Sequence, residues 1–378
     1  MKRIILTILS AGLGLTAAAQ NSESFTDTNE YGQSVVAHRL TPEVQDGILV
    51  LKNDNVGYRF WFDVRVQADG AVFFGNDKDY DPIGNGMNIR RARFAVKGRF
   101  DDKWYGELDT DFTSGTLELK DAIIAYTGLP YTEFRVGNFK ENFSIQRNTS
   151  SRYLTFMERP MVTSLAPSRH LGVNATFAKD WLYASAGVFG PELKGAEEME
   201  TMEDYNKDFG YNEGLSYTGK LAYRPLYKLK DAALHIGAAF SYREPKLTST
   251  DGYRVARYSS RNSTSINRKK YLDTDVIKGV DHEIAYTFEL AGYWKALRYE
   301  GAYMARSAIL DRSVNDKGPQ TADGWYVQAS WLLFGGEHSY DPDRGKFNRI
   351  TRGRGWGDIE YCLRYESCDF NTADYFGG

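Results

Sequence analysis

Arginine and hydroxyl side chains concentrate in one long polar segment, residues 140–169. Its arginines are Arg147, Arg152, Arg159 and Arg169, and the accompanying hydroxyl side chains are those of Thr149, Ser150 and Ser151. Guanidinium forks and hydroxyl donors suit a tetrahedral oxyanion, because a fully ionised oxyanion offers only hydrogen-bond acceptors. Folded into a lumen that Arg91 and Arg93 already line, this segment would form a cationic constriction.

Two further segments concentrate charge. Residues 243–270 carry eight basic and two acidic side chains, a net charge of +6, which suits either a cationic funnel for anions or a solvated loop. Residues 190–214 carry eight acidic side chains against Lys194 and Lys207, which is typical of a solvated external loop.

No pattern typical of an enzyme or a metal site is present. The five histidines (His38, His170, His235, His282 and His338) have no metal-ligand spacing, and neither a G-x-S-x-G elbow nor a Walker loop occurs. We therefore expect no catalytic residue, no metal and no cofactor. Cys362 and Cys368 are expected to be unpaired thiols, since a disulfide would require the chain to turn back between them.

The first 19 residues have the features of a secretory signal peptide. Lys2 and Arg3 precede an apolar stretch at residues 4–15, and small residues follow at Ala17 and Ala19. Removal of Lys2 and Arg3 takes the net charge from -3 to -5. This acidic balance and the secretory signal disfavour nucleic acid as a partner.

Composition excludes a helical membrane protein. The mean hydropathy is -0.51, and no apolar run beyond the N-terminus approaches the ~18–20 residues that a spanning helix needs. A chain of 378 residues would normally form two or three soluble domains, but no linker rich in Pro, Ser or charge interrupts it. One large domain is therefore expected.

From Gly57 onward, apolar and polar residues alternate with a period of two, which predicts β-strands. The predicted strands are residues 57–67, 88–100, 104–112, 118–127, 132–139, 170–178, 182–189, 215–224, 232–243, 282–294, 297–306, 324–334 and 357–366. A turn at residues 101–103 would keep the apolar sets of its two strands on one side. In that register Phe100 faces Trp104, Lys97 faces Glu107, and Arg93 faces Asp111.

Short turns alternate with long polar connections along these thirteen strands, as in a transmembrane antiparallel β-barrel. Only the connection at residues 335–356 is longer than this scheme predicts. A soluble β-sandwich has the same alternation, so periodicity alone does not distinguish a lipid-facing from a core-facing apolar surface. The signal peptide, the aromatics near strand ends and the unbroken domain favour the membrane barrel.

Six motifs between residues 88 and 173 resemble the phosphate-selective porin O and P family. They are NIRRARFAVKGRF (88–100), WYGELDTDF (104–112), LKDAIIAYTGLP (119–130), FRVGNFKENFSI (134–145), TSSRYLTFMERP (149–160) and LAPSRHLGV (165–173). The resemblance implies a sixteen-stranded outer-membrane barrel, usually trimeric, in which anions diffuse through an arginine-lined pore.

By motif, the resemblance assigns the constriction to Arg90, Arg91, Asp121, Arg147, Ser150, Ser151 and Arg159. Arg93 is a further candidate by strand parity, and Arg152 by its place in segment 140–169. Arg90 and Arg91 are adjacent and point oppositely in a regular strand, so the strand must bend or bulge if both reach the lumen. Arg93 and Lys97 face Asp111 and Glu107, which would neutralise them.

The expected organisation is a signal peptide at 1–19, an N-terminal periplasmic segment at 20–56 and a porin domain at 57–378. An odd number of strands cannot close a barrel with both ends on the periplasmic side, and family members continue for about three more strands. The sequence is therefore expected to lack the last strands of its barrel.

The predicted function is passive diffusion of anions, phosphate or other oxyanions, through the outer membrane of a Gram-negative bacterium. The expected partners are small anions, outer-membrane lipid and, in a homotrimer, further copies of the chain. Two alternatives remain: a general porin of low specificity, and a surface-exposed binding or adhesion barrel that uses the acidic loop 190–214.

Overall fold

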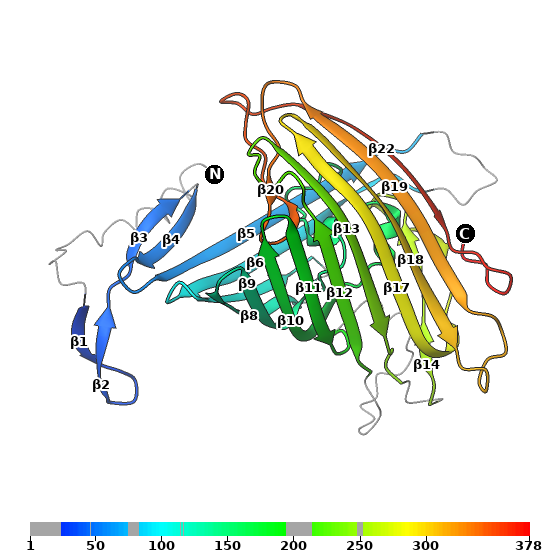
Figure 1. Ribbon diagram of the computed structural model, residues 1–378, viewed down its shortest axis with the longest axis horizontal. Coiled ribbons are helices and arrows are strands. Elements are labelled where there is room, and N and C mark those ends of the chain that lie inside the picture. Colours follow the sequence, from blue (N-terminus) through cyan, green and yellow to red (C-terminus); the bar gives the residue numbers. More distant parts are fainter. Residues whose placement is uncertain are drawn as a thin grey trace.

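The computed structural model describes residues 24–45, 47–74, 83–113, 115, 117–193, 214–247 and 252–378. The predicted signal peptide and most of the acidic loop 190–214 lie outside these residues. In the described part, one antiparallel sheet of sixteen strands dominates the molecule (Figure 1). Among the helices described, none has the length and apolar character needed to cross a membrane.

Thirteen long strands form consecutive neighbours in this sheet, and each overlaps one of the predicted segments. They are β5 (Tyr58–Ala71), β6 (Gly86–Phe100), β7 (Trp104–Asp111), β8 (Glu118–Leu129), β9 (Thr132–Lys140), β10 (Arg169–Lys179), β11 (Leu182–Phe189), β12 (Ser216–Tyr223), β13 (Ala232–Arg243), β17 (Ile277–Trp294), β18 (Leu297–Leu310), β19 (Gln320–Leu332) and β22 (Glu360–Asp369). The predicted all-β class is confirmed.

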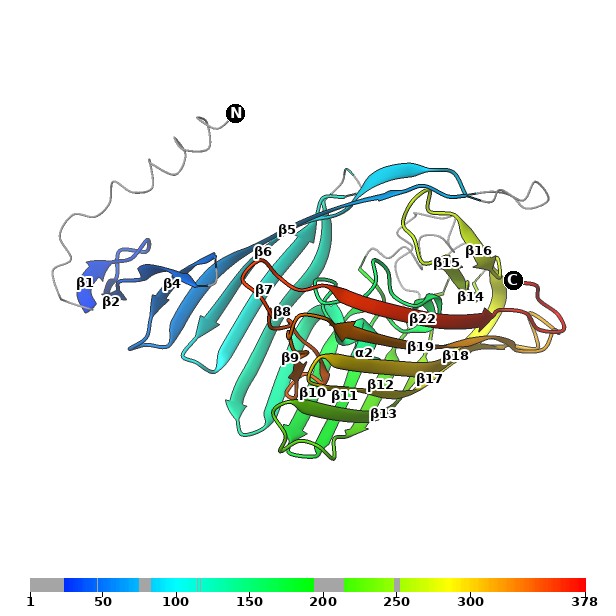
Figure 2. The same ribbon diagram turned by 90° about the horizontal axis from the view of Figure 1, so that it is seen from above.

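The remaining strands are short and were not predicted. β3 (Thr41–Gln45) and β4 (Ile48–Asn53) extend the sheet beyond β5, and β14 (Arg254–Ala256) pairs with β17. Three pairs form hairpins of their own: β1 (Ser24–Thr28) with β2 (Ser34–His38), β15 (Ser259–Arg261) with β16 (Lys270–Asp273), and β20 (Tyr340–Asp341) with β21 (Lys346–Phe347). The sheet curves between its edge strands β3 and β22, which are not paired with each other in the described residues (Figure 2).

The β6–β7 hairpin has the predicted register. Phe100 lies opposite Trp104, Lys97 opposite Glu107, and Arg93 opposite Asp111. Asp101 and Asp102 adopt positive φ angles in the turn, of 51° and 49°. A turn of three residues therefore places both apolar sets on the same face, as the alternation requires.

The apolar face of the sheet is its outer face. Val64 is 65% exposed, Leu221 62% and Phe288 60%, whereas the alternate positions carry buried polar residues such as Lys220 and Glu289. In a soluble sandwich, a second sheet would cover the apolar face. Exposed apolar residues outside and polar residues inside are the arrangement of a membrane barrel, which decides between the two interpretations of the alternation.

Two connections enter the concave side of the sheet from opposite ends. Segment 140–169 contains the helical turns α2 (Ile145–Asn148) and η1 (Met161–Leu165). The connection between β19 and β22 carries the β20–β21 hairpin, and the backbone N–H of Phe347 lies 3.3 Å from Oγ1 of Thr149. Ile145 and Phe347 share an apolar cluster with Ala291 and Tyr293. Connection 335–356 is thus longer than predicted because it folds into the lumen.

Candidate functional site

A polar cavity of about 210 Å³ lies between the inner wall and the two inserted segments. Its basic lining residues are Arg65, Arg93, Lys97, Arg135, Lys140, Arg152, Arg169, Arg344 and Lys346. Its acidic lining residues are Asp63, Glu107, Asp109, Asp121, Glu133 and Asp343. The lining thus has nine basic and six acidic residues, an excess of basic side chains.

Arg90 and Arg91 both face inward because β6 has a β-bulge at Arg90. Arg91 lies opposite Gln67, but the next pair along the strands is Ile89 with Ala68, which leaves Arg90 as the extra residue. Arg90 forms an ion pair with Glu158 of segment 140–169, and its Nη2 lies 3.0 Å from Oε2. Arg91 donates from Nη1 to Oε1 of Gln67 over 2.9 Å. The bulge thus meets the condition for two adjacent arginines to share one face.

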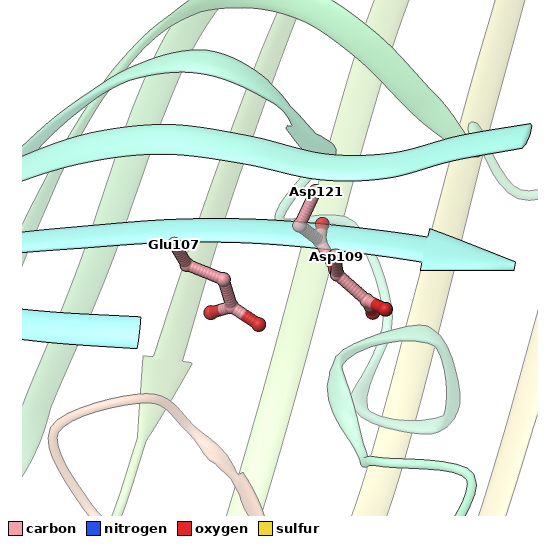
Figure 3. A group of neighbouring side chains, drawn as sticks. All are labelled: Glu107, Asp109 and Asp121. Atoms are coloured by element: carbon pink, nitrogen blue, oxygen red, sulfur yellow. The ribbon is translucent and has the colours of Figure 1, made fainter. Parts of the chain in front are cut away.

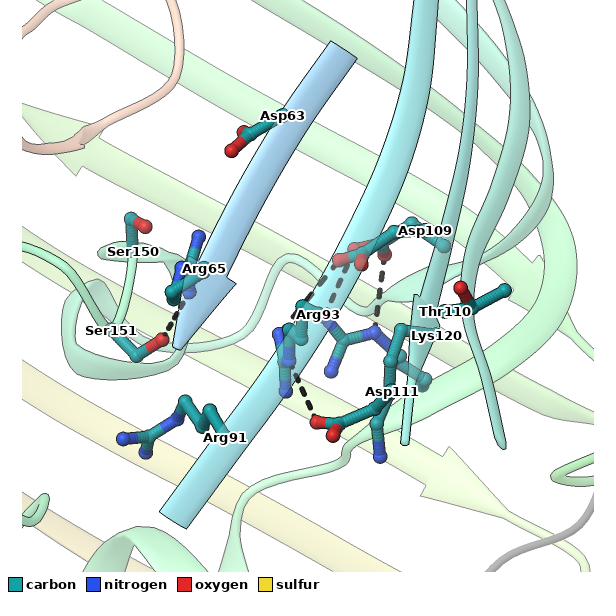
Figure 4. A network of polar contacts seen from close by, with 12 residues as sticks. Asp63, Arg65, Arg91, Arg93, Asp109, Thr110, Asp111, Lys120, Ser150 and Ser151 are labelled. Carbon is teal, nitrogen blue, oxygen red and sulfur yellow. Dashed lines mark hydrogen bonds and ion pairs between the residues drawn. The ribbon is translucent and has the colours of Figure 1, made fainter. Parts of the chain in front are cut away.

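The wall cations of β6 are paired with carboxylates, as the register predicted. Arg93 Nε lies 2.9 Å from Oδ2 of Asp111, an interaction drawn in Figure 4. Lys97 Nζ lies 3.0 Å from Glu107 and 3.1 Å from Asp63. Carboxylates of the same wall therefore balance the positive charge of these cations.

Asp121 lies in a group of three carboxylates from adjacent strands, Glu107, Asp109 and Asp121, whose oxygens lie within 4.8 Å of one another (Figure 3). Arg169 binds both oxygens of Asp121, at 3.2 and 2.9 Å. Arg93 lies 3.8 Å from Asp109. Because protein cations already compensate these carboxylates, the group anchors guanidinium groups in the wall.

Segment 140–169 brings Ser150, Ser151 and Arg152 to the cavity. Ser151 Oγ accepts a hydrogen bond of 2.6 Å from Nη1 of Arg65 on β5, and Arg152 forms an ion pair with Asp63. Figure 4 shows Ser150 and Ser151 on the segment beside Arg65, with Arg91 and Arg93 projecting from β6 nearby. The structure therefore places these predicted residues in one polar site.

Arg147 and Arg159 do not line the cavity. Arg147 Nη2 donates to the carbonyls of Thr163 and Ala166, at 3.1 and 2.6 Å. Arg159 donates to the carbonyls of Gln146 and Thr149, both at 2.7 Å. Both guanidinium groups thus cross-link the backbone of segment 140–169.

Glu158 connects segment 140–169 to strand β6 through its ion pair with Arg90. Burial raises the pKa of its carboxyl, but the hydrogen bond and charge of Arg90 outweigh this and hold that pKa below its ordinary value. The carboxylate is therefore ionised at neutral pH, and the ion pair with Arg90 is present.

Five basic residues of the cavity were not selected from the sequence: Arg65, Arg135, Lys140, Arg344 and Lys346. Arg65 was recognisable by its inward parity on the first strand. For Arg344 and Lys346 no local signal existed, because only the folding of the β20–β21 hairpin places them in the lumen. Burial, followed by the charge of Arg344, lowers the pKa of Lys346 to about 8.

Arg65, Lys140, Arg344 and Lys346 differ from the other cavity cations in their partners. In the part of the chain that the structure describes, the ion pairs within 4.0 Å include Arg90, Arg93, Lys97, Arg135, Arg152 and Arg169, but none of these four. Lys140 Nζ donates to the carbonyl of Arg147 over 3.1 Å, so Arg65, Arg344 and Lys346 are the cavity cations without a nearby carboxylate that also project into the cavity.

A family model for phosphate-selective porin O and P matches residues 60–377. The chain belongs to this family. Porin O of Pseudomonas aeruginosa is 24% identical over 390 residues, which cover 96% of this chain and 82% of that protein. This porin therefore functions as a channel of the Gram-negative outer membrane.

Solved structures are also similar to this porin. Outer-membrane expressed OmpT of Vibrio cholerae shares 13% identity at a TM-score of 0.45, with 86% of this chain and 85% of that chain covered. The outer-membrane channel DcaP of Acinetobacter baumannii shares 13% identity at a TM-score of 0.35, with 82% and 97% covered.

Proposed function

We propose that this porin passes small anions, with a preference for phosphate or similar oxyanions. The observation that supports this most is a group of cavity cations, Arg65, Arg344 and Lys346, that have no carboxylate oxygen within 4.0 Å among the residues that the structure describes. The hydroxyls of Ser150 and Ser151 lie in the same cavity. A phosphate oxygen accepts hydrogen bonds from guanidinium, ammonium and hydroxyl groups alike, so each kind of side chain would contribute.

The cations that are paired with carboxylates would act differently from Arg65, Arg344 and Lys346. Arg93, Lys97 and Arg152 hold carboxylates in the described wall, so they shape the passage and attract anions only weakly. Several moderate sites along one path favour conduction, because one tight site would retain the anion. The acidic lining residues would keep each interaction moderate.

We also propose the chain organisation that the sequence predicts. A leader at 1–19 would direct secretion, residues 20–56 would form the N-terminal periplasmic segment, and residues 57–378 would form the porin domain in outer-membrane lipid. The assembly would be a homotrimer, as the family resemblance implies.

Reversal potentials in planar bilayers test the proposal. With purified protein in a KCl gradient, we expect a potential of the sign for chloride permeation, and added phosphate should reduce the chloride current. A cation-selective potential would contradict anion transport.

A general porin of low specificity is the second candidate, and the six acidic lining residues favour it. Carboxylates beside the cations reduce the field that an anion experiences. In that case chloride would still permeate, but phosphate at equal concentration would leave the chloride current unchanged.

A further inference from the structure

Segment 140–169 is fastened to the wall at the first residue of each of its two helical turns. The backbone N–H of Ile145, which begins α2, donates to Oε2 of Glu289 over 2.8 Å. The N–H of Met161, which begins η1, donates to Oε2 of Glu366 over 2.7 Å. The first N–H groups of a helical turn have no acceptor within it, so an outside carboxylate satisfies them.

Glu289 occupies a completely buried position on β17. Its carboxylate pairs with Lys220 of β12, and neither side chain is exposed. Nε2 of His235 on β13 lies 2.9 Å from Oε1. A buried carboxylate is tolerated only with a charge partner and full hydrogen bonding, so the N–H of Ile145 is an integral member of this group.

The residue opposite Glu289 on β13 leaves room for these contacts. Gly237 pairs with Glu289 in the sheet register. A Cβ at Gly237 would lie 2.7 Å from Nε2 of His235 and 2.8 Å from Oε1 of Glu289. Any larger residue there would therefore displace the carboxylate or the imidazole.

The same group reaches the second inserted segment. Nδ1 of His235 lies 2.6 Å from the hydroxyl of Tyr340 on the β20–β21 hairpin. Glu289 thus lies between the start of α2 on one side and, through His235, the hairpin on the other. The group of Glu289 and His235 therefore contacts both lumen segments.

Glu366 makes a comparable link on β22. Its Oε1 accepts from the hydroxyl of Ser263 over 2.5 Å, and Arg364 of the same strand donates to the carbonyl of Glu158 over 2.9 Å. Because Ser263 lies in the connection between β13 and β17, Glu366 joins that connection to the start of η1.

We propose that Glu289 and Glu366 are positioning residues that hold segment 140–169 across the lumen and so set the width of the passage. Neither residue lines the cavity of about 210 Å³. They act through the backbone of the segment, which carries Ser150, Ser151 and Arg152 to that cavity. The size of the conductance is measured separately from the ion selectivity, so a failure of this proposal can be distinguished from a failure of the proposed anion preference.

Glu283 provides a matched control. It lies on β17, is buried, and forms an ion pair of 2.7 Å with Arg306 on the neighbouring strand. The hydroxyl of Tyr258 also donates to it, over 2.7 Å. Arg306 and Tyr258 both lie outside segment 140–169.

The test is single-channel conductance of the full-length chain in planar bilayers, with Glu366→Leu, Glu366→Gln, Glu289→Gln and Glu283→Gln compared with the parent. Leucine removes the acceptor for Met161, whereas glutamine retains an acceptor oxygen. We expect Glu366→Leu to raise conductance about 1.5- to 2-fold with added current noise, and Glu366→Gln to restore most of the parental value.

Glu289→Gln should also raise conductance, because the two carboxylate oxygens of Glu289 serve Ile145 and Lys220 separately and the single acceptor oxygen of glutamine cannot serve both. Glu283→Gln should leave conductance unchanged, because the described contacts of Glu283 are with Arg306 and Tyr258 and not with segment 140–169. If Glu289→Gln does not fold, Gly237→Ala replaces it, since that change displaces the carboxylate and keeps every charge. Equal conductance of Glu366→Leu, Glu366→Gln and Glu283→Gln in folded barrels would overturn the proposal.

Discussion

Arg65 Nη1 donates to the hydroxyl of Ser151 over 2.6 Å, across 86 residues of sequence. The first residue belongs to the wall strand β5 and the second to the inserted segment 140–169. In the described chain, Arg65 has no carboxylate within 4.0 Å. Its partner Ser151 is a hydroxyl residue that the family motif predicted for the site. It marks a place where wall and segment together line the cavity.

Replacing Arg65 should weaken the interaction with phosphate. We expect Arg65→Gln to make phosphate block of the chloride current about fivefold weaker, equivalent to ~1 kcal/mol for one charge-assisted hydrogen bond in contact with water. The control is Lys103→Gln, because Lys103 is an exposed turn residue paired with Asp101. Equal block in the two variants would show that Arg65 is not part of the anion path.

Conduction should depend on pH near the pKa of Lys346. Because burial and Arg344 lower that pKa to about 8, the side chain is charged below this pH and neutral above it. Anion selectivity, measured from reversal potentials, should therefore fall between pH 7 and pH 9. Lys346→Arg should remove this dependence, since arginine stays protonated throughout. A parental profile unchanged by that substitution would exclude Lys346 as its source.

The contribution of Arg159 to the conductance should depend on the shape of its guanidinium group. Its guanidinium bridges the carbonyls of Gln146 and Thr149, which a single ammonium group cannot copy. We expect Arg159→Lys and Arg159→Gln to change single-channel conductance by similar amounts. If lysine preserved the parental conductance and selectivity while glutamine did not, the positive charge would be the important property.

Gly137 should be essential for the β8–β9 pair. It has a φ of +128°, and a Cβ there would lie 2.0 Å from the carbonyl oxygen of Ala122. Gly137→Ala should therefore destabilise the barrel by ~2–4 kcal/mol, seen as a lower temperature for the heat-induced shift in gel mobility. Gly106→Ala is the control, because the atoms nearest to a Cβ there lie 4.0 Å away. Equal shift temperatures for the two variants would refute the steric argument.

Much of the fold was predictable because strand alternation is a local property. The positions of the thirteen long strands and the pairing of Arg93 with Asp111 follow from a period of two and a short turn. The inward direction of Arg91 and Arg93 followed from the same parity. The direction of the apolar face did not, since alternation is identical in a sandwich and a barrel.

The tertiary structure decided which of the described cations have a carboxylate within 4.0 Å. Arg90 pairs with Glu158 and Arg152 with Asp63, so motif residues are neutralised by partners 68 and 89 positions away. Lys346 enters the cavity only because its connection folds back into the lumen. Coulomb energy depends on distance in space, and such distances between remote residues are fixed by packing of the whole chain.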